Sequence, residues 1–538
     1  MPRAMGFFDR WRRRKQRLER LEAPWGDRPS IYDDVRAHVR PDGSLPAEYV
    51  LPDEPEPDGS RIRWAAGALD GVLSHHMGGG EAGDEARRAA EIVTRTIALV
   101  AEPSDARLAA LAALLEEPLL GSADAIVKEL AARGDQDAEG LHALGRFLAT
   151  RAADREAVKL GLLLLGLVSG TDDGEVLATL GAHDELALFA IVATLNRPDF
   201  GERDLWTIAK RARGWGRVQA VERLAGTTDP AIQGWLLREG FRNEVMDEYL
   251  AYTCAVTGRL HEALAADEVD GALLAGAAGF LAALAHGGPA EDLRDYEHGP
   301  LVSERFLALL EARAEVGLEL LPAVAALGSF VDAPHDWDAL EGWTPAVRAR
   351  IREAARRILG EAGVRERVEG ALDSAAEDER YLGEHLAELL GIDTWARVQA
   401  RLERTPVDPH AWSDLMRQCD EERIDVALGL AERLPLDAIA TGPADSLGLG
   451  LEFAPHSCLD VIVQDLDRYP GRGWSLVKTA LQSPVVRNRN LALHALASWP
   501  RDAWPDEARG ALESARAREP LEEVRARIDD VLAGREPR

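Results

Sequence analysis

The sequence is poor in the residues on which several large classes of protein depend. It has three cysteines in 538 residues, Cys254, Cys419 and Cys458, and no two of them form a C-x-x-C pair. A disulfide-stapled fold and a zinc knuckle are therefore excluded. Basic residues are also scarce, because 63 Lys and Arg stand against 93 Asp and Glu, for a formal net charge of −30. A dedicated duplex-binding protein needs a basic face to displace counterions, so we expect no duplex nucleic acid among the partners.

Long hydrophobic runs are missing too. The longest stretch without a charged residue or a histidine, Gly271 to Ala285, has 15 residues, and a bilayer span needs roughly 20. No secretory hydrophobic segment follows the basic start of the chain, as a signal peptide would require. We therefore expect a cytoplasmic protein. Only five lysines occur, and the excess of Arg, Ala, Gly and Leu is typical of GC-rich bacterial coding.

The positive charge that is present is concentrated at the start of the chain. Residues 1–20 hold eight basic and two acidic side chains, a net charge of +6, which leaves −36 for the other 518 residues. Phe7, Phe8 and Trp11 stand beside this arginine run. One interpretation is an interfacial anchor, whose aromatic rings insert while the arginines meet anionic lipid. The other is a basic tail, or a helix that docks on the acidic body.

Residues 21–60 are rich in Pro, Gly and Asp and end in the run LPDEPEPDGS at positions 51–60. Proline lacks the amide hydrogen that a helix interior uses, so the composition predicts an extended leader without regular helix. The main body begins near Arg61. Its first part, residues 61–100, is predicted to be an N-terminal helical cap with a Gly-rich loop.

From residue 101 to residue 538 the pattern is helical and repetitive. Blocks of Ala, Leu, Arg and Glu, each long enough for one short helix, alternate with Gly, Pro and Asp breaks, and strand-type alternation is nearly absent. For example, four apolar residues stand at positions i, i+3, i+4 and i+7: Ala492, Ala495, Leu496 and Trp499. Helices this short are stable only when a neighbour covers the apolar stripe. We therefore predict an all-α fold, an α-solenoid of stacked helical hairpins.

Repeated phrases support this prediction. The helix opening Pro-x-Val-Arg occurs at 345–348 and 484–487, and a related Val-Arg ends at Arg525, 38 residues after Arg487. HEAT and armadillo repeats have a period of about 40 residues. A second phrase, Trp-x-Arg-Val-Gln-Ala, occurs at 215–220 and 395–400, and an Asp-Pro pair follows each copy. Either two related halves that meet near residues 335–345 or widely spaced equivalent repeats would explain it.

Two resemblances follow from these phrases. The stretch PVVRNRNLAL at 484–493, with Ala495 and Leu496, resembles the first helix of a HEAT-type repeat. Together with IRWAAGALDGV at 62–72 and the pair His75-His76, it also resembles a group of bacterial proteins labelled limonene hydroxylase. The solenoid resemblance covers residues 100–538, whereas the narrower one rests on short phrases. The label implies terpene oxidation, and thus a small-molecule enzyme.

The motifs that such chemistry needs are absent from the sequence. A haem-thiolate oxygenase holds its iron through a cysteine in a Gly-rich turn, and none of the three cysteines has that frame. Gly78, Gly80 and Gly83 form a G-x-G-x-x-G pattern, but it follows a helical segment rather than a strand, which favours an interhelical loop over a nucleotide site. No P-loop, HExxH or GxSxG motif occurs. We predict no catalytic residue, no metal and no cofactor, and an interaction protein rather than an enzyme.

Two groups of residues remain as candidate binding sites. Asp70, His75 and His76 precede the glycine loop and form either a functional pocket or a capped and packed helix end. A run of four polar residues opens a helix near the C-terminus: Arg487, Asn488, Arg489 and Asn490. These could recognise an anionic partner through charge-assisted hydrogen bonds, or two of them could face acidic neighbours along the stack.

A third group has the carboxylate density that suits a hard cation: Asp332, His335, Asp336 and Asp338. It lacks the spacing of an EF-hand loop, and Trp337 in its midst indicates a packed turn instead.

We therefore expect an acidic α-solenoid scaffold or adaptor whose surface binds another macromolecule, a protein with basic segments. One alternative is the small-molecule enzyme, with a pocket near Asp70, His75 and His76. The other is a membrane-surface adaptor that uses residues 5–20. The sequence indicates no oligomeric state.

Overall fold

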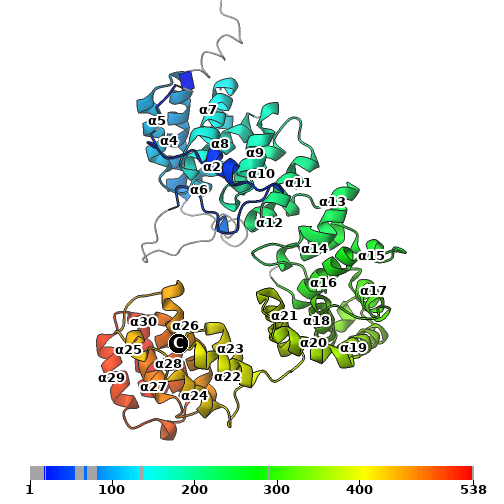
Figure 1. Ribbon diagram of the computed structural model, residues 1–538. Helices are drawn as coiled ribbons and strands as arrows, with labels where there is room; N and C mark the ends of the chain where they lie inside the picture. Colours follow the sequence, from blue (N-terminus) through cyan, green and yellow to red (C-terminus); the bar gives the residue numbers. More distant parts are fainter. Residues whose placement is uncertain are drawn as a thin grey trace, which may run out of the picture. The chain divides into compact units, whose positions relative to one another are not determined.

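The computed structural model shows an all-α protein, as predicted (Figure 1). It describes residues 17–18, 20–22, 24–54, 66–68, 82–133, 137–168, 170–288 and 290–535. Within these ranges, the β-type pairing is limited to one isolated bridge between Ser446 and Val485. In the same ranges, no helix combines the length and the apolar character that a membrane crossing requires.

The chain forms two compact units, which divide between Leu386 and Ala387. This division differs from the junction near residues 335–345 that the duplicated phrases suggested. That region lies inside the first unit, between two helices that pack against each other, α18 and α19.

The helices of the first unit are α2 (Ile31–His38), α4 (Ala82–Ala101), α5 (Asp105–Ala112), α6 (Leu120–Ala132), α7 (Ala138–Arg151), α8 (Arg155–Leu167), α9 (Gly174–Leu180), α10 (Asp184–Leu195), α11 (Glu202–Arg211), α12 (Trp215–Glu222), α13 (Pro230–Trp235), α14 (Glu248–Thr257), α15 (Leu260–Ala263), α16 (Gly271–His286), α17 (Gly299–Glu311), α18 (Leu321–Asp332), α19 (Pro345–Leu359) and α20 (Ala362–Leu372). Helix α21 (Glu377–Leu389) crosses the division. The second unit contains α22 (Trp395–Arg404), α23 (Pro409–Arg417), α24 (Ile424–Ala431), α25 (Leu436–Ile439), α26 (Ala454–Gln464), α27 (Trp474–Ala480), α28 (Val486–Ser498), α29 (Ala508–Arg518) and α30 (Glu522–Ala533).

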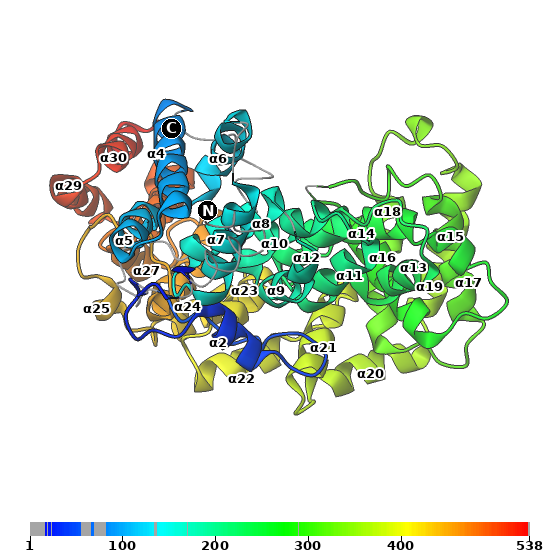
Figure 2. The same ribbon diagram turned by 90° about the horizontal axis from the view of Figure 1, so that it is seen from above.

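Helices of the first unit pack both within hairpins and from one hairpin to the next. Helix α7 lies against α8, α9 against α10, and α11 against α12. In addition α8 packs on α10, α10 on α12, α12 on α14, α14 on α16 and α16 on α18, so every second helix forms a row (Figures 1 and 2). The apolar side chains of the row are buried against these neighbours, which is what helices of this length require.

The distance between equivalent helices is shorter than the phrases predicted. Helices α8, α10 and α12 begin at Arg155, Asp184 and Trp215, about 30 residues apart. In the second unit, α22, α24, α26 and α28 follow one another with a similar spacing. The 38-residue interval is longer because α28 and α30 begin at Val486 and Glu522, 36 residues apart, and because Arg487 is the second residue of α28 whereas Arg525 is the fourth residue of α30. The two arginines therefore do not occupy equivalent positions.

The duplicated Trp-x-Arg-Val-Gln-Ala phrase marks the same local structure in each unit. Trp215 is the first residue of α12 and Trp395 the first residue of α22. The Asp-Pro pairs that follow begin the next helices, with the Asp229 and Asp408 side chains as N-caps and a proline in the first turn. Proline is tolerated there because the amide hydrogen that it lacks has no partner inside the helix.

The leader differs from the extended segment that its prolines predicted. Helix α2 forms between Pro29 and Pro41, where eight consecutive residues contain no proline, and the Ser30 hydroxyl accepts the N–H of Asp33 as its N-cap. The helix buries Ile31 and Val35 completely, and the main-chain N–H of Ile31 donates to the carbonyl of Ala152. The leader is therefore part of the core of the first unit.

Residues 39–54, which we call the strap, follow α2 without regular structure. Leu45 and Leu51 are buried beneath the strap, whereas Val50 is 55% exposed. The strap crosses the body at the starting ends of α8, α10 and α12, where the candidate site lies.

Candidate functional site

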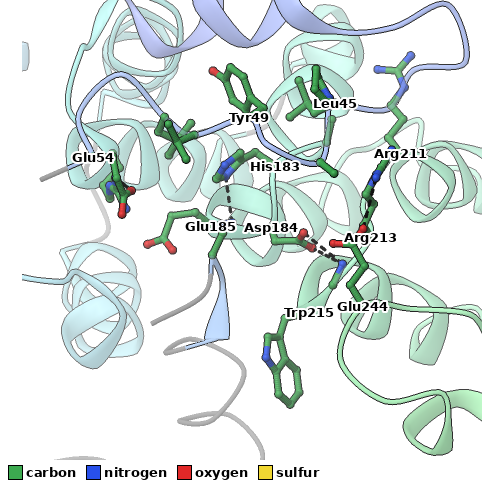
Figure 3. Close-up of a pocket in the computed structure, with 18 of the residues that line it drawn as sticks. Leu45, Tyr49, Glu54, His183, Asp184, Glu185, Arg211, Arg213, Trp215 and Glu244 are labelled. Atoms are coloured by element: carbon green, nitrogen blue, oxygen red, sulfur yellow. Dashed lines mark hydrogen bonds and ion pairs between the residues drawn. The ribbon is translucent and has the colours of Figure 1, made fainter. Parts of the chain in front are cut away.

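The strap and the N-terminal ends of three successive row helices enclose a cavity of about 550 Å³ (Figure 3). Arg155 opens α8, Asp184 and Glu185 open α10, and Trp215 opens α12. These positions come together because the helices begin about 30 residues apart and pack side by side. The N-terminal ends of helices carry partial positive charge, so acidic groups are favoured in this cavity.

Arg155 fastens the end of the strap to the start of α8. Its main-chain N–H donates to Oδ2 of Asp53 at 2.7 Å, and its guanidinium contacts Oδ1 of Asp53 at 3.0 Å and Oε2 of Glu54 at 2.6 Å. Asp53 is therefore held both by an arginine and by a helix N-terminus, the arrangement in which a carboxylate is bound most strongly.

His183 is the N-cap of α10 and the most deeply buried ionisable group of the cavity wall. It is 8% exposed, and its ring meets the Tyr49 ring edge-on with 5.7 Å between centroids. The N–H of Glu185 donates to Nδ1 of His183 at 3.3 Å, so the neutral ring carries its proton on Nε2. Burial lowers the pKa of His183 to about 4, which keeps the ring neutral near pH 7. Nε2 hydrogen-bonds no residue that the structure describes.

Asp184 links two successive helices of the row. Its Oδ1 accepts the N–H of Gly214 at 3.1 Å and that of Gly216 at 2.7 Å, so a carboxylate on α10 caps α12. Burial raises the pKa of Asp184 to about 6, although these amide bonds act in the opposite direction. A Cβ at Gly216 would lie 2.8 Å from Oδ1 of Asp184 and 2.5 Å from Cβ of Ala187, so only glycine fits against the carboxylate.

A buried ion cluster lies behind this wall. Lys159 of α8, 1% exposed, contacts Oε1 of Glu156 at 3.1 Å and Oε1 of Glu185 at 2.7 Å. Burial acts to raise the pKa of Glu185, but the Lys159 ammonium outweighs it and the pKa is lowered. For Glu156, burial prevails and the pKa is raised, although Oε2 also accepts the N–H of Leu119 at 2.6 Å. Glu185 is thus ionised and already neutralised by lysine.

The rim of the cavity carries a second set of charges. Arg213 contacts Oε1 of Glu244 at 3.3 Å, and the Glu244 side chain is 59% exposed. Arg211 donates to the carbonyl of Ala178 at 3.0 Å and fits beneath Gly43 of the strap. Figure 3 shows the carboxylates of Asp184 and Glu185 pointing in opposite directions, that of Asp184 toward Arg213 and Glu244, while the Trp215 ring points away from the other side chains.

The cavity wall therefore offers hydrogen bonds and charges, which suit binding. Each of the three cysteines lies in the interior of its unit, and burial raises the thiol pKa, to about 11 for Cys419 and about 12 for Cys458. Thiols of this kind are poor nucleophiles. In the ranges that the structure describes, no group of His, Cys, Asp and Glu is arranged to hold a metal ion.

Several predicted residues lie outside the described ranges. These are the aromatic residues of the N-terminal segment and the residues before and in the glycine loop: Phe7, Phe8, Trp11, Asp70, His75, His76, Gly78 and Gly80. The nearest described residues are part of the candidate site. Ala66 lines the cavity, and the N–H of Gly67 donates to Oε2 of Glu185 at 3.0 Å.

The polar run at the start of α28 lies largely in the core of the second unit. Asn488 is 0% and Arg489 2% exposed, so the interior of the unit covers both side chains. Arg489 instead contacts Oε2 of buried Glu519 at 2.8 Å, and Arg487 pairs with Asp460. This is the alternative interpretation, in which two arginines face acidic neighbours.

The rest of this run belongs to a buried polar network. Nδ2 of Asn488 donates to the carbonyl of His456 at 2.9 Å, and the Ser483 hydroxyl donates to Oδ1 of Asn488 at 2.6 Å. Asn490 is partly buried, and its Oδ1 has no hydrogen-bond partner. The network joins α26 to α28, so its role is to hold the stack together.

The acidic group near residue 335 is a packed turn. Asp332 pairs with Arg352, and the His335 ring packs tilted against Phe330 and edge-on against Trp337, with centroid distances of 4.6 and 4.8 Å. Among the described residues, no metal-binding group forms here or elsewhere.

The sequence reasoning missed the cavity. A signal was present in His183-Asp184-Glu185, because a polar cap followed by acidic residues precedes the apolar run of α10. It indicated only a helix start, and nothing in the local sequence connected it to Arg155 or the strap.

Comparisons with known proteins assign no family. No family model matches the chain, and no curated protein gives a match. Among solved structures, an engineered protein from the Northeast Structural Genomics Consortium is 17% identical, with 83% of this chain and 98% of that chain covered. The TM-score of this match is 0.22.

Proposed function

We propose that this chain is an α-solenoid of HEAT-like hairpins that serves as a scaffold, and that it binds another protein through a segment rich in basic residues. The proposal joins two parts, a repetitive architecture and a preference for positive charge. Each rests on separate features of the described structure.

The first unit supports a repetitive architecture through its row of helices and through two matching ion pairs. Arg350 of α19 contacts Glu304 of α17 at 2.5 Å, and one heptad further on Arg357 contacts Glu311 at 2.8 Å. Because both helices advance by the same number of residues between the pairs, α17 and α19 run parallel. Parallel packing of every second helix is expected of stacked hairpins.

The strap is the observation that carries the binding function. It is a segment of turns without regular structure, which Arg155 at the start of α8 holds through bonds to Asp53 and Glu54. The Tyr49 ring of the strap also packs edge-on against His183 at the start of α10. Stacked repeats present long surfaces to their partners, and the first unit already holds one irregular segment, its own.

Charge favours a basic partner. The body carries −36 after the basic first 20 residues are set aside. An excess of this sign speeds the encounter with a positively charged segment and selects against acidic competitors. The exposed carboxylate of Glu244 places part of this charge at the cavity rim.

Two other functions depend on residues outside the described ranges. The hydroxylase-type resemblance needs a pocket at Asp70, His75 and His76, and the membrane-surface adaptor needs Phe7, Phe8 and Trp11. No contact within the described part of the chain favours the enzyme or the membrane adaptor, so we propose the scaffold.

Fluorescence anisotropy with matched peptides tests the proposal. A labelled nonapeptide with four lysines and arginines is compared with its charge-reversed counterpart of Asp and Glu, each at low and at physiological salt. We expect the basic peptide to bind, and to bind at least about tenfold more weakly at the higher salt, because screening weakens exposed charge pairs. Equal binding of both peptides, or binding of neither, would contradict the proposal.

A further inference from the structure

We propose that the cavity under the strap is the anchor site for one lysine or arginine of the partner, with Asp184 and Glu244 facing the cation and His183 donating from Nε2 to the main-chain carbonyl of the same segment. This inference rests on the proposed function and names the place on the first unit where the basic segment is bound. The site lies within the first unit alone, since every residue involved belongs to that unit.

His183 supplies the first argument. Its side chain is more than nine-tenths buried and lines the cavity, yet only Nδ1 is used within the fold. Nε2 is not among the buried atoms that lack a partner, so it is open to the cavity, where a carbonyl of an incoming segment can accept its N–H. A neutral ring cannot attract an anion strongly, whereas a peptide carbonyl is a suitable acceptor for its N–H.

The lining carboxylates supply the second argument. Four of them reach the cavity, and two are neutralised within the fold: Glu54 by Arg155 and Glu185 by Lys159. Asp184 accepts only main-chain amides. Glu244 shares one long contact with Arg213 and remains mostly exposed. A cation that enters therefore meets Asp184 and Glu244, whose carboxylates lie on the same side of the cavity (Figure 3).

The walls match the remainder of a long basic side chain. Apolar groups from the strap and from the turn before α14 line the cavity, among them Pro46, Val50 and Val245. Val50 is 55% exposed and its side chain is open to contact from outside. Lysine and arginine bury their methylene stems along such surface and keep the charged end beside carboxylates.

The arginines of the rim do not favour an anion instead. Arg213 is engaged with Glu244, and Arg211 donates to Ala178 beneath Gly43. Both would have to leave these contacts to reach an acidic ligand. Binding of an acidic nonapeptide distinguishes an anion site from the lysine site.

The experiment uses the full chain and a labelled nonapeptide of glycine and serine with a single central lysine. Its control peptide carries ε-acetyl-lysine at that position, which keeps the length and removes the charge. We expect the lysine peptide to bind and the acetylated peptide to bind at least about fivefold more weakly, as for loss of one partly exposed ion pair.

Three variants locate the contact. Glu244→Gln changes an exposed side chain and is expected to weaken binding of the lysine peptide severalfold. His183→Phe keeps an aromatic ring against Tyr49 and is expected to weaken binding to a similar extent. Glu268→Gln removes an exposed acid far from the cavity along the chain and is expected to leave binding unchanged. Thermal unfolding of each variant shows whether His183→Phe remains folded. If that variant unfolds, the binding measured for Glu244→Gln alone tests the assignment of the cavity.

The results separate the two proposals. If basic peptides bind the wild-type chain but Glu244→Gln and Glu268→Gln bind them equally well, the scaffold function stands and the cavity assignment is overturned. If no basic peptide binds, the scaffold function fails first. Tighter binding of an acidic nonapeptide, lost in Arg211→Gln, would overturn the assignment in favour of an anion site.

Discussion

Oδ1 of Asp184 on α10 accepts the main-chain N–H of Gly216 on α12 at 2.7 Å, so the cap of one row helix is supplied by the previous one. Replacement of Asp184 by Ala leaves the first-turn amides of α12 without their acceptor. We expect the free energy of unfolding to fall by about 1–3 kcal/mol, and Asp184→Asn to cost less because its amide oxygen still accepts. Urea denaturation measures both. Asp267→Ala, at an exposed position, is the control and is expected to change stability by no more than about 0.5 kcal/mol.

His183 and Asp184 predict opposite dependences of stability on pH. The pKa of His183 is lowered from 6.5 to about 4, so its contribution is lost as the pH falls through this window. The pKa of Asp184 is raised from 3.8 to about 6, so its contribution grows as the pH falls through the same window. The groups facing them are Glu185, Glu244, Arg155 and Arg217.

We therefore expect these two contributions to cancel in the wild-type chain between pH 6 and pH 4. His183→Phe should become more stable on acidification relative to wild type, and Asp184→Asn less stable. Chemical denaturation at several pH values checks this. Parallel pH profiles for the wild type and both variants would contradict the assigned protonation states.

Lys159 neutralises two buried carboxylates, so its loss should be among the most damaging single changes in the first unit. Lys159→Met leaves Glu156 and Glu185 buried without their cation, at an expected cost of about 3–5 kcal/mol. Arg133→Met removes a partner from the exposed pair Arg133–Glu129 and should cost less than about 1 kcal/mol. Differential scanning calorimetry distinguishes the two, and similar costs would show that Lys159 is not essential to the cluster.

Arg489 and Glu519 make the corresponding test in the second unit. Both are buried, and Arg489 also donates to the carbonyls of Ser483 and Pro484. Arg489→Met alone should cost about 3–5 kcal/mol, whereas Arg489→Met with Glu519→Met should recover much of that loss because no unpaired charge remains. A double-mutant cycle by urea denaturation gives the coupling. Simple additivity of the two single changes would contradict the pairing.

The leader is predicted to be essential to the first unit, while the segment before it is not. Deletion of residues 1–54 removes seven buried apolar side chains, Leu18, Trp25, Ile31, Tyr32, Val35, Leu45 and Leu51. Each contributes about 1.5–3 kcal/mol when fully buried, so we expect the first unit to lose cooperative unfolding. Deletion of residues 1–16 should leave the melting temperature unchanged. Limited proteolysis and thermal unfolding of both deletions test this difference.

The all-α class could be predicted from the sequence because the spacing of apolar residues within a short segment indicates a helix. The stripe Ala492, Ala495, Leu496 and Trp499 is buried as its spacing indicated, with no residue of the four more than 3% exposed. Helix α2 was missed because the leader was judged by its overall proline content, although the prolines flank the helix and do not enter it.

The candidate site could not be predicted from local sequence patterns. Arg155 and Asp53 are 102 positions apart, and Lys159 and Glu185 are 26 apart, so the cavity exists only after the row of helices has formed. The run at Arg487 to Asn490 shows the converse difficulty. Its charges suggest a surface, but the ion pair with Glu519 and the network around His456 place most of it inside. Burial of charge depends on a partner that the local sequence does not show.

The position of the strap also sets an order of events during synthesis. The leader finds its place only on helices made much later, since Asp53 needs Arg155 and Gly43 packs on Arg211. At translation rates of about 5–20 residues per second, the leader must wait several seconds with its apolar side chains uncovered. The second unit, whose ion pairs and hydrogen bonds mostly join helices close together in the chain, has no such delay. The nascent first unit is therefore the stage at which this protein most needs protection by chaperones.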